Sequence, residues 1–446
     1  MSTRKINAVR GMNDLLPSAA AVLEHFERLA IGALRSYGYR QIRTPVVEPT
    51  AVFRRSLGEV TDIVEKEMYT FVDSLNGESL TLRPENTAGV VRATIEHSLL
   101  HDGPCRLWYY GPMYRHERPQ RGRYREFFQI GAEALGFAGP EVEVEQILLL
   151  QRLWRALDLG PVGLQLNTLG QPDERMRHRL ELVAFLQANR AELDADAQRR
   201  IETNPLRILD SKHPGTQACL ERAPRLMDFL GEGSLSHFER VQQLLRQEQI
   251  AFQINPRLVR GLDYYNLTVF EWVTDRLGAQ GTICGGGRYD GLFEVLGGRP
   301  TPACGFSIGV ERVLELLGER VGTNVACDIY VLHQGGPTYD AALRAAERLR
   351  DAGMDVILHA DAASLKSQMR KADASGAEFA VIIGVEENAE ASATVKALRT
   401  SAEGAAFGQQ QRVPIDELAP RLVDALCAEQ ADCEQEAAAA GTSDAI

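Results

Sequence analysis

The sequence predicts an α+β fold, in which an antiparallel sheet flanked by helices carries a helical insertion and is followed by a C-terminal α/β domain. Short strand and hairpin patterns dominate from about residue 47 to residue 135. Residues 171–203 and 224–250 have a mostly helical, polar pattern and lie between two strand-rich blocks. After Val325, strands and helices alternate, which is typical of an α/β domain with a largely parallel sheet.

Changes in pattern along the 446 residues mark the predicted domain boundaries. A chain of this length holds two or three domains, each with its own core. We expect a main domain over residues 1–325 with an inserted module at about 171–230, and a second domain over 326–426. The alanine-rich, acidic residues 427–446 have little apolar surface to bury, so we expect a disordered tail there.

The first two predicted elements are a helix and a strand. Apolar residues recur at helical spacing from about Ser18 to Tyr37, and Gly38 closes the helix. The extended segment from Gln41 to Val47 follows and contains Pro45. Because proline cannot donate a backbone hydrogen bond, we expect this strand at the edge of a sheet or at a subunit boundary.

The C-terminal domain alternates strands and helices at short intervals. Its expected elements, in chain order, are Ile329–Leu332, Tyr339–Arg350, Asp355–Leu358, Leu365–Ala374 and Phe379–Ile383. Gly353 and Gly376 separate the two helices from the strands that follow them.

Composition and charge exclude several classes of protein. Hydrophobic residues make up 44% and charged residues 25% of the chain, as in ordinary soluble globular proteins. No apolar stretch resembles a secretory signal or a bilayer span, so we expect a cytoplasmic protein with no membrane partner. The seven cysteines form no CxxC pair, which argues against a disulfide framework or a structural zinc site. With a net charge of −12, any nucleic-acid partner requires a local basic patch.

Such a patch lies within the segment from Arg106 to Gly136. Five arginines fall within eleven positions of the loop between two predicted strands, namely Arg115, Arg118, Arg121, Arg123 and Arg125. The planar guanidinium group donates paired hydrogen bonds to phosphate. Strand alternation places Gln129 and Glu133 on one face of the second strand, where an amide and an acid suit an amino acid. For any one of these residues the alternative is a solvated sheet face beside an exposed basic hairpin.

Two later segments hold weaker candidates. The segment from Leu258 to Val273 is predicted to be an apolar strand, interrupted only by Arg260 and Asp263. Taken alone, Arg260 is more simply an edge-strand ion pair than a catalytic group. In Gly281–Leu292, three consecutive glycines end a predicted strand, where they permit positive φ or close approach of a ligand. This run lacks the spacing of a P-loop or of a dinucleotide-binding turn.

Arg312 and Glu85 each occupy the first turn of a predicted helix. In Ala303–Leu317, the cation of Arg312 opposes the helix dipole, and such local violations tend to mark functional sites. A triphosphate would suit it, and a salt bridge to a nearby acid is the alternative. In Ser79–Val90 the helix is expected to open at Pro84, and Glu85 is explained equally well as a favourable helix start.

Taken in this order, the segments resemble the class II aminoacyl-tRNA synthetases, and specifically the histidyl-tRNA synthetase family, over most of the chain. YGPMYRHERPQRGRYREFFQ and GFSIGVERVLEL resemble class II motifs 2 and 3, and the helix and strand from Ser18 to Pro49 resemble the motif 1 dimerisation element. LVRGLDYY and GGGRYDGL resemble the two histidine-specific signatures and are more discriminating. The resemblance implies a class II antiparallel sheet and a C-terminal anticodon-binding domain.

The resemblance also implies how ATP is used. Arg115 would bind the α-phosphate, Arg312 the γ-phosphate, and Arg123 would be a further ATP contact. Arg260 would be catalytic together with Arg115. It would lie between the histidine carboxylate and the α-phosphate, where negative charge gathers during in-line attack. Mg²⁺ would bridge the ATP phosphates, held mainly by phosphate oxygens and water and by no dedicated protein metal site.

A pocket for histidine is implied in the same way. Glu85, Thr87 and Gln129 would hold the α-amino group. Glu133 and Tyr265 would hydrogen-bond the two imidazole nitrogens. Two aromatic side chains would close the pocket, namely Tyr264 and Tyr289. A site that satisfies both ring nitrogens rejects analogues that lack them, because its buried polar groups are then left unpaired.

The implied macromolecular partners are tRNA-His and a second copy of the chain. Arg118, Gln120 and Arg121 would contact the acceptor end of the tRNA, which in this family carries an extra 5′ guanosine. The motif 1 element implies a homodimer. The expected activity is ATP-dependent formation of histidyl-adenylate and transfer of the histidyl group to the 3′ end of tRNA-His.

Two rivals share parts of this pattern. A non-catalytic, histidine-sensing regulatory paralogue of an ATP phosphoribosyltransferase reuses the catalytic fold. Such paralogues lack the anticodon-like domain and usually lose the catalytic arginine, whereas this chain has both Val325–Leu426 and Arg260. Class II synthetases for threonine, proline or glycine have a similar C-terminal domain, and LVRGLDYY disfavours them.

Overall fold

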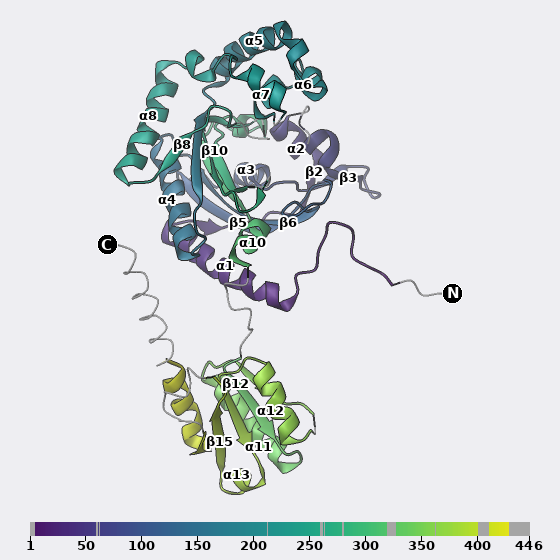
Figure 1. The fold of residues 1–446 in the computed structure, drawn as a ribbon, viewed down its shortest axis with the longest axis vertical. Coiled ribbons are helices and arrows are strands. Elements are labelled where there is room, and N and C mark those ends of the chain that lie inside the picture. The colour runs from purple at the N-terminus through teal and green to yellow at the C-terminus, as the bar shows by residue number, and fades with distance from the viewer. Residues whose placement is uncertain are drawn as a thin grey trace. The chain divides into compact units, whose positions relative to one another are not determined.

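The computed structural model describes residues 5–58, 61, 63–211, 213–258, 262, 264–278, 281–318, 327–361, 363–399 and 410–427. The chain divides into two compact units, residues 1–321 and residues 322–446 (Figure 1). The predicted tail over 427–446 lies, except for Cys427, outside the described residues. Among the helices that are described, none is long and apolar enough to cross a membrane.

The first unit is built on an eight-stranded sheet with the strand order β1-β5-β6-β11-β10-β9-β7-β8. Its strands are β1 (Arg40–Gln41), β5 (Cys105–Tyr114), β6 (Glu126–Leu135), β7 (Gly163–Thr168), β8 (Phe252–Ile254), β9 (Asn266–Val273), β10 (Thr282–Arg288) and β11 (Ala303–Gly309). All central pairs are antiparallel, and only the two edge pairs, β1 with β5 and β7 with β8, are parallel. The predicted α+β class with an antiparallel sheet is confirmed.

Helices cover both faces of this sheet. The first face carries α1 (Pro17–Ser36), α4 (Glu141–Ala156), α8 (Glu232–Gln247) and α10 (Val310–Leu317), whose apolar residues share one core with the strands. The opposite face carries α3 (Thr87–Glu96) and α9 (Leu292–Val295). Alternation along β5 explains the two cores, because Trp108 packs into the first, and Leu107 and Tyr109 pack into the second.

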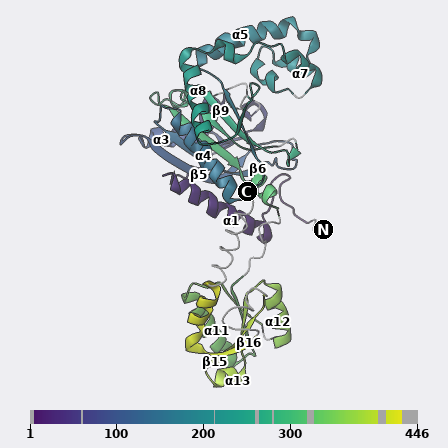
Figure 2. The same cartoon turned by 60° about the vertical axis from the view of Figure 1, so that its left-hand side comes forward.

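The predicted first helix is confirmed to within one residue at each end. Its buried residues recur every four positions, namely Val22, Phe26, Ala30 and Leu34. Gly38 follows with φ of +77°, a backbone conformation that glycine adopts without steric cost. Figure 2 shows α1 and α4 lying alongside the sheet.

A small three-stranded sheet with the order β2-β4-β3 completes this part of the unit. It contains β2 (Val47–Pro49), β3 (Tyr69–Val72) and β4 (Ser79–Leu82), with α2 (Thr50–Leu57) and a π-helical turn η1 (Ile63–Glu67) beside it. The single strand predicted over Gln41–Val47 is wrong, because the chain forms β1 in one sheet and β2 in the other. Pro45 lies between them and belongs to neither strand, and each strand is at the edge of its sheet.

A helical module follows β7 and has a hydrophobic cluster of its own. It contains α5 (Pro172–Ala188), η2 (Arg190–Glu192), α6 (Ala195–Arg200), η3 (Pro205–Asp210), α7 (Pro214–Leu220) and η4 (Leu226–Phe229). Leu182, Leu186 and Cys219 are fully buried in that cluster. Helix α8 comes next, and its Phe238 and Val241 pack into the core of the main sheet instead. Figures 1 and 2 both show α5 and α7 together at the end of the unit opposite α1.

The second unit has a five-stranded sheet with the order β13-β12-β14-β15-β16. Its elements are β12 (Ile329–His333), α11 (Pro337–Asp351), β13 (Val356–Leu358), α12 (Leu365–Ala374), β14 (Phe379–Ile383), α13 (Val385–Ala389), β15 (Ser392–Ala397), β16 (Gln410–Pro414) and a helix over 415–427. Helix α11 and the helix over 415–427 pack on one face, and α12 packs on the other. The predicted alternation is confirmed as far as β14.

The expectation of a largely parallel sheet is wrong for its second half. Strand β12 is parallel to β13 and β14, whereas β15 is antiparallel to β14 and to β16. A parallel crossover needs a connection of about a dozen residues or more. The link from Ile383 to Ser392 is shorter than that and contains only the five-residue α13, so the chain turns back antiparallel.

One prediction near the glycine run is also corrected, because the strand expected over Leu258–Val273 begins only at Asn266. The prediction that the three glycines end a strand is confirmed to within one residue, since β10 finishes at Arg288 directly after them. A side chain at Gly286 would overlap the Gly305 carbonyl on the neighbouring strand, so glycine is needed for β10 to pack against β11.

Candidate active site

A cavity of about 340 Å³ opens on the sheet face opposite α1 and α4. Its walls come from β5, β6, β9, β10 and β11, from the start of α3 and α10, and from the loop between β5 and β6. Eight of the side chains predicted for the site line this cavity, namely Glu85, Thr87, Arg115, Arg123, Gln129, Tyr264, Tyr265 and Arg312. Strands that are far apart in sequence therefore bring the candidates together.

A second, larger cavity of about 890 Å³ lies where the helical module meets the main sheet. Arg175, Arg257 and Leu226 are among its lining residues, and Leu262 lines both cavities. Of the predicted site residues that the structure describes, none lines the larger cavity. We take the smaller cavity as the candidate active site, because it gathers the cations together with buried acids of shifted pKa.

Glycines on the strands make room for the polar floor of this cavity. Gly305 pairs with Glu133 across β11 and β6, and a side chain at Gly305 would overlap the Glu133 carboxylate. Gly131 pairs with Tyr109, and a side chain at Gly131 would overlap the tyrosine ring. The first glycine of GFSIG and the glycine of QIGAE are therefore needed for the Glu133 and Tyr109 side chains to fit. Strand alternation alone did not predict this requirement.

Glu133 and Tyr289 lie beneath the cavity rather than among its lining residues. Both are 1% exposed. The hydroxyl of Thr87 donates to Glu133 Oε1 at 2.8 Å, and the hydroxyl of Tyr289 donates to Glu133 Oε2. Burial raises the pKa of Glu133 to about 8, against the lowering effect of these hydrogen bonds. The acid therefore keeps its proton near neutral pH.

Three tyrosine rings surround this acid. The ring centroids of Tyr264 and Tyr265 are 4.8 Å apart, and those of Tyr264 and Tyr289 are 5.6 Å apart. Burial raises the pKa of Tyr264 and Tyr289 well above the usual value, so their hydroxyls remain hydrogen-bond donors. Tyr109 also lines the cavity, and the sequence analysis missed it. Its register opposite Gly131 on β6 could have revealed it.

Glu85 occupies a different position from the one expected. Helix α3 begins at Thr87 and not at Pro84. The Glu85 carboxylate accepts the backbone N–H groups of Thr87 at 2.6 Å and Ala88 at 3.0 Å, so it caps the helix start. Glu85 is 4% exposed, and burial raises its pKa. The helix-start interpretation is correct for this residue, and its side chain nevertheless lines the cavity.

The two polar atoms of the Gln129 side chain differ in their hydrogen bonding. Its amide nitrogen donates to the Ser307 hydroxyl at 3.4 Å. Its Oε1 atom is buried and, within the described part of the chain, has no hydrogen-bond partner. Because such an orphaned acceptor costs free energy, a ligand N–H directed at this oxygen would be stabilised.

The arginines of the cavity are held by backbone carbonyls. Arg115 Nε donates to the Pro84 carbonyl at 2.9 Å, and its guanidinium carbon lies 5.2 Å from the ring centroid of Phe127. Arg312 donates to the carbonyls of Gly122, at 3.1 Å, and Thr282. These contacts fix the direction of each guanidinium group at the cavity wall, where a planar donor suits an anionic ligand.

Arg123 pairs with two acids. It contacts Glu117, and its Nη2 lies 3.7 Å from Glu67 Oε1. Among the described residues, no cluster of three or more acidic, histidine or cysteine side chains could hold a metal ion. Carboxylates that line the cavity include Glu117, Glu271 and Glu311.

Three further predicted residues, which belong to the described part of the chain, do not line the cavity. Arg118, Gln120 and Arg121 are exposed on the loop between β5 and β6, and Arg121 pairs with Glu315 of α10. The predicted catalytic Arg260 lies outside the described residues, between Leu258 and Leu262.

The arrangement brings two kinds of chemistry to one cavity. Arg115 and Arg312 provide fixed cations that suit phosphate oxygens, and the acid and tyrosine hydroxyls around Glu133 suit a small polar ring with N–H groups. A carboxyl group activated by a nucleotide phosphate needs both partners next to each other.

Comparisons with known proteins agree with this geometry. The histidyl-tRNA synthetase family model matches residues 11–313, and an anticodon binding domain model matches residues 327–425. A histidine–tRNA ligase of Paraburkholderia phymatum is 59% identical over 434 residues, which cover 96% of this chain and 97% of that protein. One from Cupriavidus taiwanensis is 60% identical and covers 95% of this chain and 94% of that protein.

Solved structures give the same result. Apo histidyl-tRNA synthetase from S. aureus superposes with a TM-score of 0.76 at 32% identity, covering 93% of this chain and 99% of that chain. The family model alone spans more than half of the 446 residues, and the curated relatives extend the match through the second unit. The chain therefore belongs to the histidyl-tRNA synthetase family.

Proposed function

We propose that this chain is a histidine–tRNA ligase, which activates L-histidine with ATP to histidyl-adenylate and transfers the histidyl group to the 3′ end of tRNA-His. One observation carries the proposal most strongly. A single cavity joins carbonyl-oriented arginines to a buried acid that is hydrogen-bonded to tyrosine and threonine hydroxyls. Relatives at 59–60% identity over nearly the whole chain bear the same activity in their names.

Histidine would bind through its ring at one end and its amino group at the other. Glu133 and Tyr265 would meet the two imidazole nitrogens, with Tyr264 and Tyr289 packed around the ring. The amino group would be held by the Oε1 atom of Gln129, by Thr87 at the start of α3 and by Glu85, which caps that helix. Ring binding would shift Glu133 to its carboxylate form, with its proton released to solvent, because an ionised carboxylate is the better acceptor for an imidazole N–H.

ATP would bind with its phosphates along the arginines. Arg115 would take the α-phosphate and Arg312 the γ-phosphate, with Arg123 exchanging an acidic partner for the nucleotide. Arg260 would stabilise the negative charge that develops as the histidine carboxylate attacks the α-phosphorus. No protein nucleophile is required for this in-line displacement.

Mg²⁺ would accompany ATP as its phosphate complex. The fit to the described residues is limited to single carboxylates, such as Glu117 or Glu271, because no group of three ligands is found among them. Mg²⁺ would neutralise phosphate charge when bound, and phosphate oxygens and water would supply most of its ligands. The arginines would still orient the α-phosphate.

The proposed partners are tRNA-His and a second copy of the chain. The exposed Arg118, Gln120 and Arg121 would reach the acceptor end of the tRNA, and the domain over 326–426 would bind the anticodon.

We place the homodimer contact at the three-stranded sheet, where Phe71 and Val72 are 46% and 68% exposed. The module over about 171–230 would be an insertion in the catalytic domain over 1–325, and cytoplasm would be the site of action.

The test of the proposed function is histidine-dependent exchange of pyrophosphate into ATP without tRNA, with the other amino acids as controls. We expect exchange with histidine alone. Charging of tRNA-His would follow as the second readout. Folded protein that binds histidine without supporting exchange would favour the histidine-sensing paralogue instead.

Replacing Arg260 by histidine is expected to lower exchange by roughly 100-fold or more, because a charge that acts mainly in the transition state is lost. Histidine affinity should change much less. Arg257→His is the matched control, since Arg257 precedes it by three residues and lines the other cavity. Near-normal exchange by folded Arg260→His protein would remove this residue from the catalytic role.

A further inference from the structure

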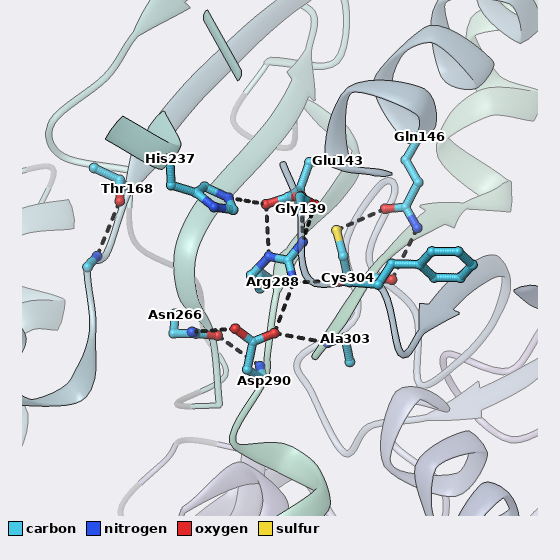
Figure 3. Close-up of polar contacts among 12 residues, drawn as sticks. Gly139, Glu143, Gln146, Thr168, His237, Asn266, Arg288, Asp290, Ala303 and Cys304 are labelled. Carbon is cyan, nitrogen blue, oxygen red and sulfur yellow. Dashed lines mark hydrogen bonds and ion pairs between the residues drawn. The ribbon is translucent and has the colours of Figure 1, made fainter. Parts of the chain in front are cut away.

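Arg288, the last residue of β10, is fully buried and uses all five of its N–H groups (Figure 3). Its Nε and Nη2 donate to the two carboxylate oxygens of Glu143 on α4, at 3.0 and 2.7 Å. Nη1 donates to the Phe137 carbonyl at 2.9 Å and to Asp290 Oδ1 at 3.1 Å. Nη2 also donates to the Gly139 carbonyl at 2.8 Å. The guanidinium group thus has one direction only.

Glu143 is held just as completely. It is 0% exposed, and its Oε1 lies 2.6 Å from Nε2 of His237 on α8. Burial would raise its pKa, but the hydrogen bonds from His237 and Arg288 outweigh burial and lower that pKa, so the group is a carboxylate. Replacing a buried ion pair by apolar groups of similar volume is often neutral or stabilising. Stability alone therefore does not account for this pair, and its geometry needs a second reason.

The network leads directly to the aromatic wall of the cavity. Asp290 accepts the Ala303 N–H at 2.9 Å through Oδ1 and the Asn266 amide at 3.1 Å through Oδ2. Its own N–H donates to Asn266 Oδ1 at 2.9 Å. Asn266 follows Tyr265 in the chain, so Asp290 ties the end of the tyrosine segment to β11. Figure 3 shows Arg288 between Glu143 and Asp290, with Asn266 and Ala303 beyond.

Tyr289 lies between the two anchored residues. Its N–H donates to the Ala303 carbonyl at 2.8 Å, and its hydroxyl donates to Glu133. The direction of the Tyr289 side chain is therefore set by the backbone at 288–290, and Arg288 and Asp290 hold that backbone on both sides.

We propose that Arg288 is a positioning residue for the amino-acid pocket: by gripping Glu143 and Asp290 it holds Tyr289 and the segment 265–266 where they orient Glu133 toward the imidazole. The inference rests on the proposed function, which assigns this pocket to histidine. Arg288 acts through Tyr289 and Asp290, and its own contacts do not include the ligand cavity. It would set affinity and selectivity for the ring without taking part in phosphate binding.

Arg288→Lys is the test, because lysine keeps the charge but has three donors and no planar fork. Glu143, Asp290 and the two carbonyls could then not all be satisfied. We expect the KM for histidine in pyrophosphate exchange to rise about 10-fold or more, and the KM for ATP to stay within about 2-fold. The matched control is Arg106→Lys. Arg106 makes the same two-bond contact, at 2.9 and 3.1 Å, from β5 to Glu145 on α4, without any link to Tyr289.

A double-mutant cycle with Tyr289→Phe separates positioning from general loosening. Because Arg288 acts in part through Tyr289, Arg288→Lys is expected to raise the histidine KM by a smaller factor in the Tyr289→Phe background than in the wild-type protein. Should Arg288→Lys fail to fold, Asp290→Asn takes its place. It keeps the Arg288–Glu143 pair and turns the Asn266 contact into two facing donors, so the same split between histidine and ATP is expected.

Three results would overturn the inference: an unchanged histidine KM in folded variants, equal rises for histidine and ATP, or effects that add in the double mutant. Loss of exchange in the wild-type protein would instead count against the proposed function. A lower melting temperature with both KM values unchanged, as for a merely structural ion pair, would also refute the positioning role.

Discussion

Replacing Arg115 by glutamine is expected to lower the rate of histidine-dependent pyrophosphate exchange by about 100- to 1,000-fold while the protein stays folded. The physical reason is preorganisation. Arg115 is fixed by the Pro84 carbonyl and by the face of Phe127 before any nucleotide arrives, so its charge stabilises the transition state without reorientation. Glutamine is uncharged and shorter, so that charge is lost at the α-phosphate.

The control for Arg115→Gln is Arg276→Gln. Arg276 is also held by backbone carbonyls, those of Leu159 at 2.7 Å and Leu316 at 3.0 Å, but it does not line the cavity. Its replacement should reduce the melting temperature more than the exchange rate. Exchange within about 3-fold of wild type in folded Arg115→Gln protein would exclude the proposed α-phosphate contact, a margin far below the loss expected for one such charge.

Glu133→Gln is expected to weaken histidine binding by about 10- to 100-fold and, at alkaline pH, to stabilise the empty protein. The pKa of Glu133 is raised from its usual 4.5 to about 8 by burial. Between these two values the unfolded chain releases the proton and the folded chain keeps it. The stability of the wild-type protein therefore falls as pH rises through this window. Glutamine resembles the protonated acid and cannot ionise, so this loss disappears.

Thermal unfolding and calorimetric titration together check this prediction. Without ligand, the melting temperature of Glu133→Gln should exceed that of the wild type by on the order of 3 °C at pH 8.5, and the two should nearly agree at pH 5. Glu311→Gln is the matched control, because burial raises the pKa of Glu311 to about 7 in the same cavity. It should shift stability with the same sign and leave histidine affinity intact. Unchanged histidine binding by Glu133→Gln would remove Glu133 from the ring contact.

Local sequence signals accounted for much of the fold. Helix α12 and strand β14 have the predicted ends, since Ser364 caps the helix through Ser367 N–H and Gly376 precedes the strand. The period of two along β6 correctly separated Ile130, in the core, from Gln129, in the cavity. Where the prediction failed, as in the single strand expected over Gln41–Val47, pairing with neighbours in two different sheets decided the structure, and no local pattern encodes such pairing.

Local sequence patterns also predicted one part of the candidate site and not the other. Side chains such as Gln129 and Arg115 follow from strand alternation and charge spacing along one hairpin. Contacts made across long stretches of chain could not be foreseen. Glu143 meets Arg288 across 145 positions, and Tyr289 meets Glu133 across 156. The segment GGGRYDGL contains Arg288, but nothing in that segment indicated that Arg288 contacts Glu143.

One carboxylate closes the base of the helical module. Glu174, near the start of α5, accepts the N–H of Gln171 at 2.7 Å, the N–H of Gly231 at 2.6 Å and the hydroxyl of Ser234 at 2.6 Å. Entry and exit of the module, some sixty positions apart, are clasped at a single point. Because the two ends of the module are held together at Glu174, its length can change without disturbing the register of the sheet strands before and after it.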